Sequence, residues 1–350
     1  IAVGKSGEPK SSKSFGRWMD AEGAVTQITR LDESPSDMRW SPDGKWLSFT
    51  MLVPAKDSWS IKMPTRPEGA KWTAGPRIID RLVYRRDRRG FLEEGFNHIF
   101  LVPAEGGTAR QLTSADYQHN DPEWTPDGKA LIFSSLRIED AEYAWRESEI
   151  YALDIASGKI TQLTARKGPD YSPLPSPDGT SIAYVGYDFT DDTYIERKLY
   201  VMGRDGANPR EIASELDRTP SGLIWAHDSK GIYFNVNDRG TRNLYFSALG
   251  ASAKQISTGN HMLTVTSIDA AGQAVGTLSA YHQPGDVVRF SLKNPGEMAQ
   301  LTRVNEDVLG TVQLGEVEEI WYKSVDDFDI QGWIIKPPDF QEAKKYPLYL

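Results

Sequence analysis

One short segment of the sequence concentrates charged side chains of the kinds that bind charged ligands. It extends over residues 85–95 and contains the pair Arg85-Arg86 near its beginning and the pair Glu93-Glu94 near its end. Adjacent carboxylates can receive a cation such as an ammonium group, and guanidinium groups can donate hydrogen bonds to carbonyl or carboxylate oxygens. The alternative is a solvated loop whose charges pair with one another. The sequence alone favours this simpler alternative, so ligand binding by the segment is a hypothesis.

A second acidic segment, residues 138–148, raises the same two alternatives on a smaller scale. Its carboxylates are those of Glu139, Asp140, Glu142 and Glu147. Because it is shorter and has fewer charges, it is the weaker candidate of the two for ligand binding.

The sequence has no pattern of a catalytic or metal site. The motif Gly-x-Ser-x-Gly, which presents the nucleophile of many serine hydrolases, does not occur. The absence of cysteine excludes disulfides, thiolate metal sites and a cysteine nucleophile. The five histidines lie in no recognisable motif with Ser and Asp and lack metal-ligand spacing, so each is interpreted as a structural or surface residue (His98, His119, His227, His261 and His282). We therefore expect no catalytic residue, metal or cofactor within this sequence.

The composition limits the class of the protein and its partners. A hydrophobic fraction of 39% and a charged fraction of 25% are typical of a soluble globular protein. The formal net charge of −9 opposes binding to a phosphate backbone, so nucleic acid is not an expected partner. No apolar run approaches the roughly 18 residues that span a bilayer, so no membrane partner is expected. The first residues are neither a Met start nor a signal sequence, and we expect a trimmed or processed N-terminus. A cysteine-free protein is compatible with both the bacterial periplasm and the cytoplasm.

A repeated phrase of the type Trp-Ser-Pro-Asp-Gly-Lys indicates the structural elements that position the charged segments. It begins at Trp40 and recurs at Trp124, at Ser176 without the Trp, in degenerate form at Trp225, and faintly at Asp269. Pro presets φ for a turn, Asp hydrogen-bonds to the backbone that follows it, and Gly supplies a positive φ. Since an alternating apolar run follows each copy, the phrase predicts a β-hairpin.

A second phrase of the type Gln-Leu-Thr marks another hairpin in each repeat. Its six copies are separated by 84, 51, 49, 44 and 45 residues and begin at Gln27, Gln111, Gln162, Glu211, Gln255 and Gln300. Two hairpins per interval make a four-stranded antiparallel unit that cannot bury both faces alone, and radial stacking of such units solves this problem. We therefore predict an all-β fold, a β-propeller of four-stranded blades, rather than a sandwich or barrel, which lacks a repeated phrase. Seven blades are favoured and six also fit, with the ring incomplete in this chain.

The first interval is too long for one blade, and after Leu314 the repeat ends. The surplus of roughly 35 residues predicts an insertion at about residues 53–95, and long insertions on rigid scaffolds concentrate binding residues.

After the propeller domain, residues 1–313, the sequence predicts a hairpin turning at Asp326-Asp327, a linker bounded by Pro337-Pro338, and the start of an apolar strand. Residues 314–350 are thus interpreted as a linker and the truncated beginning of a second domain.

The order of these segments resembles the prolyl oligopeptidase family of serine peptidases. The resemblance covers essentially the whole chain. It rests on the Ser-Pro-Asp-Gly phrases, residues 330–338 and Tyr346-Pro347-Leu348. Within the family, bacterial acylaminoacyl-peptidase and dipeptidyl-aminopeptidase-like members are similar in three segments, residues 81–87, 95–100 and 167–170. It implies that residues 314–350 begin an α/β-hydrolase domain whose Ser-His-Asp triad lies outside this chain. It also implies two partners, the protein's own C-terminal hydrolase domain and short peptide substrates, and it is compatible with a homo-oligomer.

In that arrangement the propeller restricts access to short peptides and contributes charged residues to the substrate pocket. Glu93 and Glu94 would bind a free α-amino group, while Arg85 and Arg86 would contact carbonyls or a carboxylate. The alternative is a non-enzymatic binding propeller of an envelope or periplasmic complex, which uses the same repeats. Residues 331–350 favour the peptidase, because a stand-alone propeller has no use for them.

Overall fold

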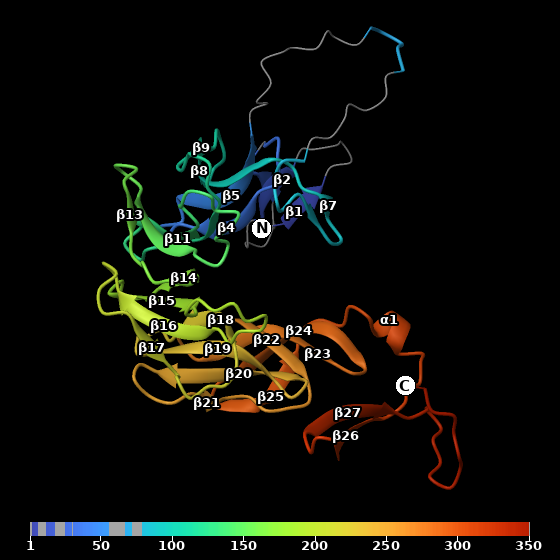
Figure 1. Cartoon of the computed structure of the whole chain (residues 1–350). Helices are drawn as coiled ribbons and strands as arrows, with labels where there is room; N and C mark the ends of the chain where they lie inside the picture. The colour runs from blue at the N-terminus through green and yellow to red at the C-terminus, as the bar shows by residue number, and fades with distance from the viewer. Residues whose placement is uncertain are drawn as a thin grey trace. The chain divides into compact units, whose positions relative to one another are not determined.

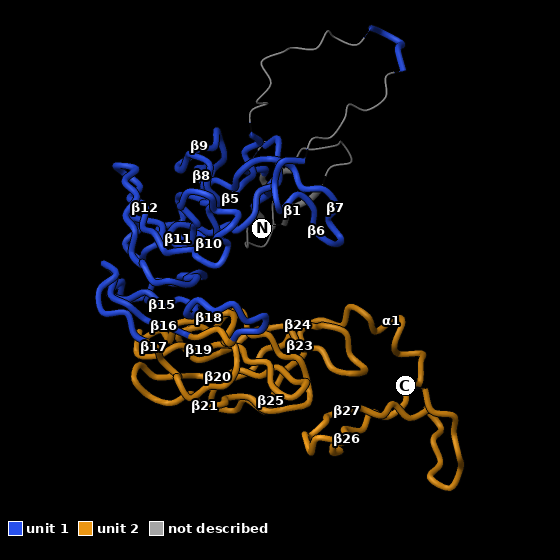
Figure 2. The backbone as a smooth tube through the Cα atoms, in the orientation of Figure 1, with its two compact units in different colours: residues 1–195, 199–210 blue, residues 196–198, 211–350 orange. Residues whose placement is uncertain are grey.

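The computed structural model describes residues 2–5, 12–17, 25–29, 31–55, 67–71 and 79–349. Nearly all of its regular structure is antiparallel β-sheet, and α1 (Glu306–Leu309) is the one helix in these ranges (Figure 1). The chain divides into two compact units, residues 1–195 with 199–210 and residues 196–198 with 211–350 (Figure 2). Within the described part, no helix has the length and apolar character needed to span a bilayer. The prediction of an all-β fold is confirmed.

The first unit contains a three-stranded sheet followed by four-stranded sheets. The three-stranded sheet consists of β1 (Ala2–Lys5), β2 (Ser12–Arg17) and β3 (Val25–Gln27). The second sheet consists of β4 (Ser36–Trp40), β5 (Trp46–Pro54), β8 (Gly95–Pro103) and β9 (Arg110–Gln111). The third consists of β10 (His119–Trp124), β11 (Ala130–Ser135), β12 (Glu149–Asp154) and β13 (Ile160–Gln162). The fourth, most of which belongs to this unit, consists of β14 (Asp170–Pro175), β15 (Ser181–Gly186), β16 (Lys198–Gly203) and β17 (Arg210–Ile212).

The second unit contains two more four-stranded groups and a separate hairpin. One group consists of β18 (Pro220–Trp225), β19 (Gly231–Asp238), β20 (Thr241–Ala248) and β21 (Lys254–Gln255). The other consists of β22 (Met262–Ile268), β23 (Gln273–Ala280), β24 (Gln283–Ser291) and β25 (Asn294–Gln300). One parallel pair, Arg242 with Met262, joins the groups into an eight-stranded sheet, and β26 (Val317–Lys323) pairs with β27 (Asp329–Ile335). Five four-stranded groups thus occupy the five intervals of the repeat, whereas the closed ring and its seven or six blades stay predictions.

The Ser-Pro-Asp-Gly phrase forms the turn between the first two strands of a sheet. The Ser41 hydroxyl donates to Asp43 Oδ1 at 2.6 Å and accepts the Trp46 N–H at 2.9 Å, while Asp43 Oδ1 also accepts the Lys45 N–H at 3.1 Å. Gly44 has φ +69°, which a residue without Cβ adopts at little cost. The copies at residues 125–130 and 176–181 repeat this network. The phrase is therefore a self-contained turn, as predicted.

The Gln-Leu-Thr phrase forms the edge strand and ties it to its neighbour. In five of the six copies, a buried or partly buried hydroxyl accepts a backbone N–H of the strand next to the edge strand at 2.9 Å (Thr29 from Ser14, Thr113 from Ile99, Thr164 from Ile150, Ser257 from Leu244 and Thr302 from Val287). The copy with Ala213 has no hydroxyl. Because an unpaired buried N–H is costly, the recurrence of Thr or Ser at this position has a physical reason.

Each inner sheet buries both faces, as β11 shows. Leu131 and Phe133 pack in a cluster with Ile99 of the preceding sheet, whereas Ile132 packs in another cluster with Ile182 of the following sheet. Full burial of one such side chain contributes about 1.5–3 kcal/mol. Alternate side chains of one strand therefore connect three consecutive sheets.

We predict that Ser257→Ala lowers the free energy of unfolding by about 1–3 kcal/mol, because the buried Leu244 N–H loses its acceptor. Urea denaturation followed by tryptophan fluorescence measures the effect. Ser252→Ala, the same substitution at an exposed position, is the matched control and should change stability by less than about 0.5 kcal/mol. Equal stabilities of the two variants would contradict the assigned role of the hydroxyl.

Candidate functional site

The predicted insertion connects β5 to β8, and it carries all four predicted ligand-binding residues. Residues 56–66 and 72–78 of the insertion lie outside the described residues. In the described part, Arg85 and Arg86 form β6 (Arg85–Arg86) and pair with Phe91 and Gly90 of β7 (Gly90–Phe91). The turn between these strands includes Arg88 at φ +61°. The arginines therefore lie on a small hairpin that projects from the sheet.

Glu93 and Glu94 lie at the base of that hairpin, immediately before β8. The Ala55 N–H donates to the Glu94 carbonyl at 3.0 Å, which continues the pairing of β5 with β8 by one more bond. Gly95 follows at φ +149°, and a Cβ there would lie 2.4 Å from the Val53 carbonyl oxygen. The backbone of Glu94 is thus held on the rigid edge of the sheet, while the side chains of Glu93 and Glu94 are exposed, as are those of Arg85 and Arg86.

The second acidic segment lies beside this insertion. It forms the connection between β11 and β12, and its Glu142 carboxylate accepts the Leu82 N–H at 3.1 Å. From the same connection, Arg146 donates to the carbonyl oxygens of Thr190, at 2.5 Å, and Asp192, at 3.1 Å, in the connection between β15 and β16. Three successive connections between second and third strands therefore contact one another at one end of their sheets.

This end of the first unit also exposes aromatic side chains. Tyr84 and Phe91 belong to the insertion, Tyr143 and Trp145 to the β11–β12 connection, and all four are more than 40% exposed. The Arg85 guanidinium lies 5.9 Å from the centre of the Phe91 ring. Carboxylates, guanidinium groups and aromatic rings at one site can bind a charged, partly apolar ligand without forming a covalent bond.

Two histidines lie beneath this end as structural residues. His119 donates from Nδ1 to the Asn97 carbonyl oxygen at 2.9 Å and accepts from Arg137 at Nε2, at 3.0 Å. Burial lowers the pKa of His119 to about 4, so the ring is neutral at pH 7. Its neighbour His98, whose pKa burial also lowers, lies 3.3 Å from the Thr113 hydroxyl. Both imidazoles are occupied by packing and hydrogen bonds.

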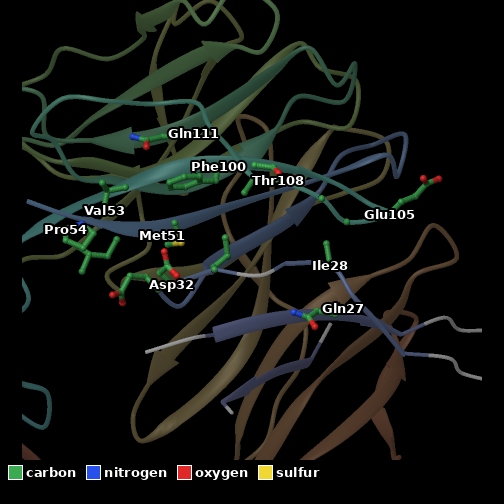
Figure 3. Close-up of a pocket in the computed structure, with 16 residues that line it drawn as sticks. Gln27, Ile28, Asp32, Met51, Val53, Pro54, Phe100, Glu105, Thr108 and Gln111 are labelled. Carbon is green, nitrogen blue, oxygen red and sulfur yellow. The ribbon is translucent and has the colours of Figure 1, made fainter. Parts of the chain in front are cut away.

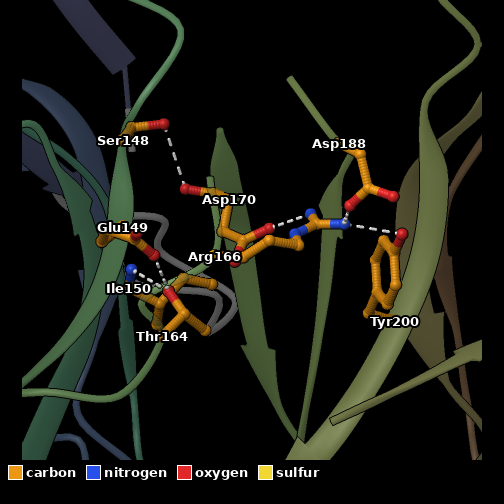
Figure 4. Close-up of polar contacts among 8 residues, drawn as sticks. All are labelled: Ser148, Glu149, Ile150, Thr164, Arg166, Asp170, Asp188 and Tyr200. Carbon is orange, nitrogen blue, oxygen red and sulfur yellow. Dashed lines mark hydrogen bonds and ion pairs between the residues drawn. The ribbon is translucent and has the colours of Figure 1, made fainter. Parts of the chain in front are cut away.

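A buried charge cluster that sequence reasoning missed lies between the third and fourth sheets (Figure 4). Asp170, at the start of β14, is buried and pairs with the Arg166 guanidinium. The figure shows this guanidinium between Asp170 on one side and Asp188 and Tyr200 on the other, with bonds of 3.2 Å to Asp188 and 2.6 Å to the Tyr200 hydroxyl. Arg166 thereby connects the start of β14 to the β15–β16 connection.

Glu149, at the start of β12, is the second buried carboxylate of the cluster. Its Oε2 accepts the Thr164 hydroxyl at 2.5 Å, and this hydroxyl in turn accepts the Ile150 N–H. Burial raises the pKa of Glu149 to about 7, and the nearby Asp170 carboxylate acts in the same direction, against the Thr164 hydrogen bond and the Arg166 charge. Residues 167–170 had drawn notice in the sequence only through the resemblance.

The described residues of this end can bind a charged ligand through their exposed carboxylates and guanidinium groups. They contain no group of three or more His, Asp or Glu side chains placed to hold a metal ion. The exposed charges of the insertion, held at the base by Glu94 and Gly95, are the candidate site.

We predict that the Glu149 carboxyl makes stability fall as pH rises from about 5 to about 8. Its pKa is higher in the folded chain than in the unfolded chain, so the folded state binds the proton more tightly and loses this advantage as pH rises through 7. Glu149→Gln should remove this dependence, and the difference in unfolding free energy between variant and parent should change by about 2 kcal/mol across that range. Urea titrations at several pH values measure the unfolding free energy of both proteins. Because His119 is present in both, its opposite contribution to the pH dependence cancels when the two free energies are subtracted. Parallel profiles for the two proteins would contradict the prediction.

The sequence is similar to those of known peptidases. The sequence matches no protein-family model. It is 27% identical over 333 residues to dipeptidyl-peptidase 5 of Porphyromonas gingivalis, covering 89% of this chain and 46% of the relative. It is 25% identical over 347 residues to the uncharacterized peptidase YuxL of Bacillus subtilis, covering 94% of this chain and 51% of the relative. The chain thus spans about half the length of the curated relatives it matches.

Solved structures show the same fold. An acylaminoacyl peptidase of Pyrococcus horikoshii superposes with a TM-score of 0.70 at 18% identity, over 96% of this chain and 48% of its own. A putative TolB of Agrobacterium tumefaciens superposes with a TM-score of 0.55 at 17% identity, over 85% of this chain and 90% of its own. The peptidase match is better in score and includes more of this chain. The chain is therefore similar in sequence to about half of two peptidases and in fold to about half of an acylaminoacyl peptidase.

Proposed function

We propose that this chain is the propeller of a serine exopeptidase or oligopeptidase, that it admits short peptides, and that it binds their N-termini through Glu93 and Glu94. Arg85 and Arg86 contact peptide carbonyls or a carboxylate. The Ser-His-Asp triad that hydrolyses the peptide bond lies in the half of the protein that the relatives have in addition to this chain. The observation that carries the proposal is the alignment of nearly the whole chain with half of dipeptidyl-peptidase 5.

The hairpin that follows the repeats makes specific contacts within the second unit. The Gln331 side chain of β27 donates to the Arg239 carbonyl oxygen at 2.9 Å, and the Arg239 guanidinium lies 5.8 Å from the Trp321 ring centre. A Cβ on Gly240 would lie 2.3 Å from the Trp333 ring. The hairpin that follows the repeats therefore packs on the turn between β19 and β20. In its own sheet the insertion is the same kind of connection, from the second strand to the third.

Two adjacent carboxylates suit a free α-amino group better than an acylated one. An ammonium group donates charge-assisted hydrogen bonds to both carboxylates, each contributing about 1.5–3 kcal/mol when it forms. An acylated N-terminus has no charge and therefore forms no charge-assisted hydrogen bond with either carboxylate. We therefore favour aminopeptidase or dipeptidyl-peptidase activity over removal of acylated residues.

The catalytic chemistry is that implied by the resemblance. A serine activated by histidine attacks the peptide carbonyl, backbone donors stabilise the oxyanion, and water releases the acyl group. The propeller contributes by excluding large substrates and by positioning the N-terminus. A non-enzymatic binding propeller is the less favoured alternative because it does not account for the β26–β27 hairpin.

In the full-length enzyme, we predict that Glu93→Gln or Glu94→Gln raises KM for dipeptidyl substrates with a free amine about 10- to 100-fold, since a charge-assisted hydrogen bond is lost. N-acylated substrates of the same sequence should change less than about twofold. Glu68→Gln, at an exposed position of the same insertion, is the matched control. Equal effects on free and acylated substrates would remove the proposed role of these carboxylates.

We further predict that residues 1–350 alone have no peptidase activity and are not labelled by a fluorophosphonate probe, because the nucleophile lies elsewhere in the protein. The full-length protein should hydrolyse dipeptidyl substrates and be labelled once per chain. Turnover by the 350-residue chain at the rate of the full-length protein would overturn the assignment of chemistry to the other half.

A further inference from the structure

A cavity of about 850 Å³ lies in the first unit, between the end of β3 and the sheet that contains β5 and β8 (Figure 3). Cavities of roughly 300–1,000 Å³ are typical of small-molecule sites. One end of this cavity is formed by Val53 and Pro54, the last residues of β5 before the insertion. The other end is formed by the turn between β8 and β9, which includes Glu105.

The wall of the cavity is apolar and built from a packed cluster. Ile28 and Phe100 are almost fully buried, and Leu31, Met51 and Val53 pack partly buried against them. Phe100 is itself fixed by stacking on Phe49, with ring centres 5.5 Å apart. The wall is therefore a formed surface that an apolar group can cover without rearranging the sheet.

The polar groups around the cavity are carboxylates. Asp32, Glu33 and Glu105 are among its lining residues, and the lining residues that the structure describes include no Lys, Arg or His. Figure 3 shows Asp32 beside Met51 and Glu105 at the far end. Within the described residues, the ion pairs include none of these three carboxylates. The cavity therefore has a negative rim over an apolar wall.

The turn that holds Glu105 is fixed against β3. Gly106 has φ +92°, and a Cβ there would lie 3.2 Å from the Ile28 carbonyl oxygen. The amides of Gln27 and Gln111, which also line the cavity, donate to the carbonyl oxygens of Thr29 and Thr113. One N–H of each glutamine amide is thus occupied within the protein, and the carboxylates are the charged groups among the described lining residues.

We infer that this cavity binds an organic ammonium ion, with its apolar body against the partly exposed Leu31, Met51 and Val53 and its charge beside the carboxylate rim. Repulsion excludes anions of the same shape. A compact metal ion is not the expected ligand, because the carboxylates are distributed along the cavity and, among the described residues, no set of three His, Asp or Glu side chains is grouped to hold one. The inference is independent of the proposed function, because none of the residues assigned to substrate binding lines the cavity.

Calorimetric titration of the full-length protein with 2-phenylethylammonium and with 2-phenylethanol tests this inference. The two probes have the same apolar body, and we expect the ammonium ion to bind about tenfold more tightly at low salt, with the preference falling as salt is added. The triple variant Asp32→Asn, Glu33→Gln, Glu105→Gln should bind both probes equally when it is made in a Glu93→Gln, Glu94→Gln background, which removes the ammonium site of the proposed function. Glu297→Gln, an exposed carboxylate of the second unit, and the pair Glu93→Gln, Glu94→Gln should keep the preference.

Methionine methyl NMR locates the probe without a destabilising substitution. The Met51 signal should shift on addition of 2-phenylethylammonium, whereas Met298, in the second unit, should not respond. Equal affinity for the charged and neutral probes, an unchanged preference in the triple variant, or an unperturbed Met51 signal would each overturn the inference. Loss of the preference in the Glu93, Glu94 pair would assign ammonium binding to the insertion instead and overturn it as well.

Discussion

The structure depends on the burial of both faces of a four-stranded sheet by its neighbours, as β11 in the third sheet shows. A single four-stranded sheet with apolar side chains on both faces would expose one of these faces to water. The alternation of side chains along β11 shows how the chain avoids this exposure. Leu131 and Phe133 contact one neighbouring sheet and Ile132 contacts the other. Burial also explains the side-chain hydrogen bonds of the two repeated phrases. The Ser-Pro-Asp-Gly turn and the Gln-Leu-Thr edge strand each supply a hydroxyl that accepts a buried or partly buried backbone N–H.

The features of interest lie in the connections between the strands of the sheets. The connections between second and third strands are the variable part of the repeat: long between β5 and β8, intermediate between β11 and β12, and a tight turn between β19 and β20. Length is tolerated there because such connections run over the surface. The charged insertion and the partner of the β26–β27 hairpin are therefore two versions of one structural position.

The fold was largely predictable from local signals, whereas the electrostatics of the interior was not. Turn and edge-strand phrases act within a few residues of themselves, so Asp43, Gly44 and Thr113 could be interpreted without knowing the neighbours. Glu149, Thr164 and Asp170 come together because β12, the edge of β13 and the start of β14 meet in space, and no sequence spacing encodes that meeting. The insertion was located by its surplus length, and the exposure of Arg85, Arg86, Glu93 and Glu94 agrees with either a ligand site or a solvated loop. The cavity beside β3 had no sequence signal, because it is formed by residues from separate segments.

The central claim is that the insertion binds the N-terminus of a peptide held in the active site of the full-length protein. A crystal structure of that protein with a dipeptidyl phosphonate on its serine tests this claim most directly. The account predicts the inhibitor's free amine within about 2.7–3.2 Å of carboxylate oxygens of Glu93 or Glu94. An inhibitor bound at the serine with its amine in solvent or held by other residues, and both carboxylates distant from it, would contradict the account.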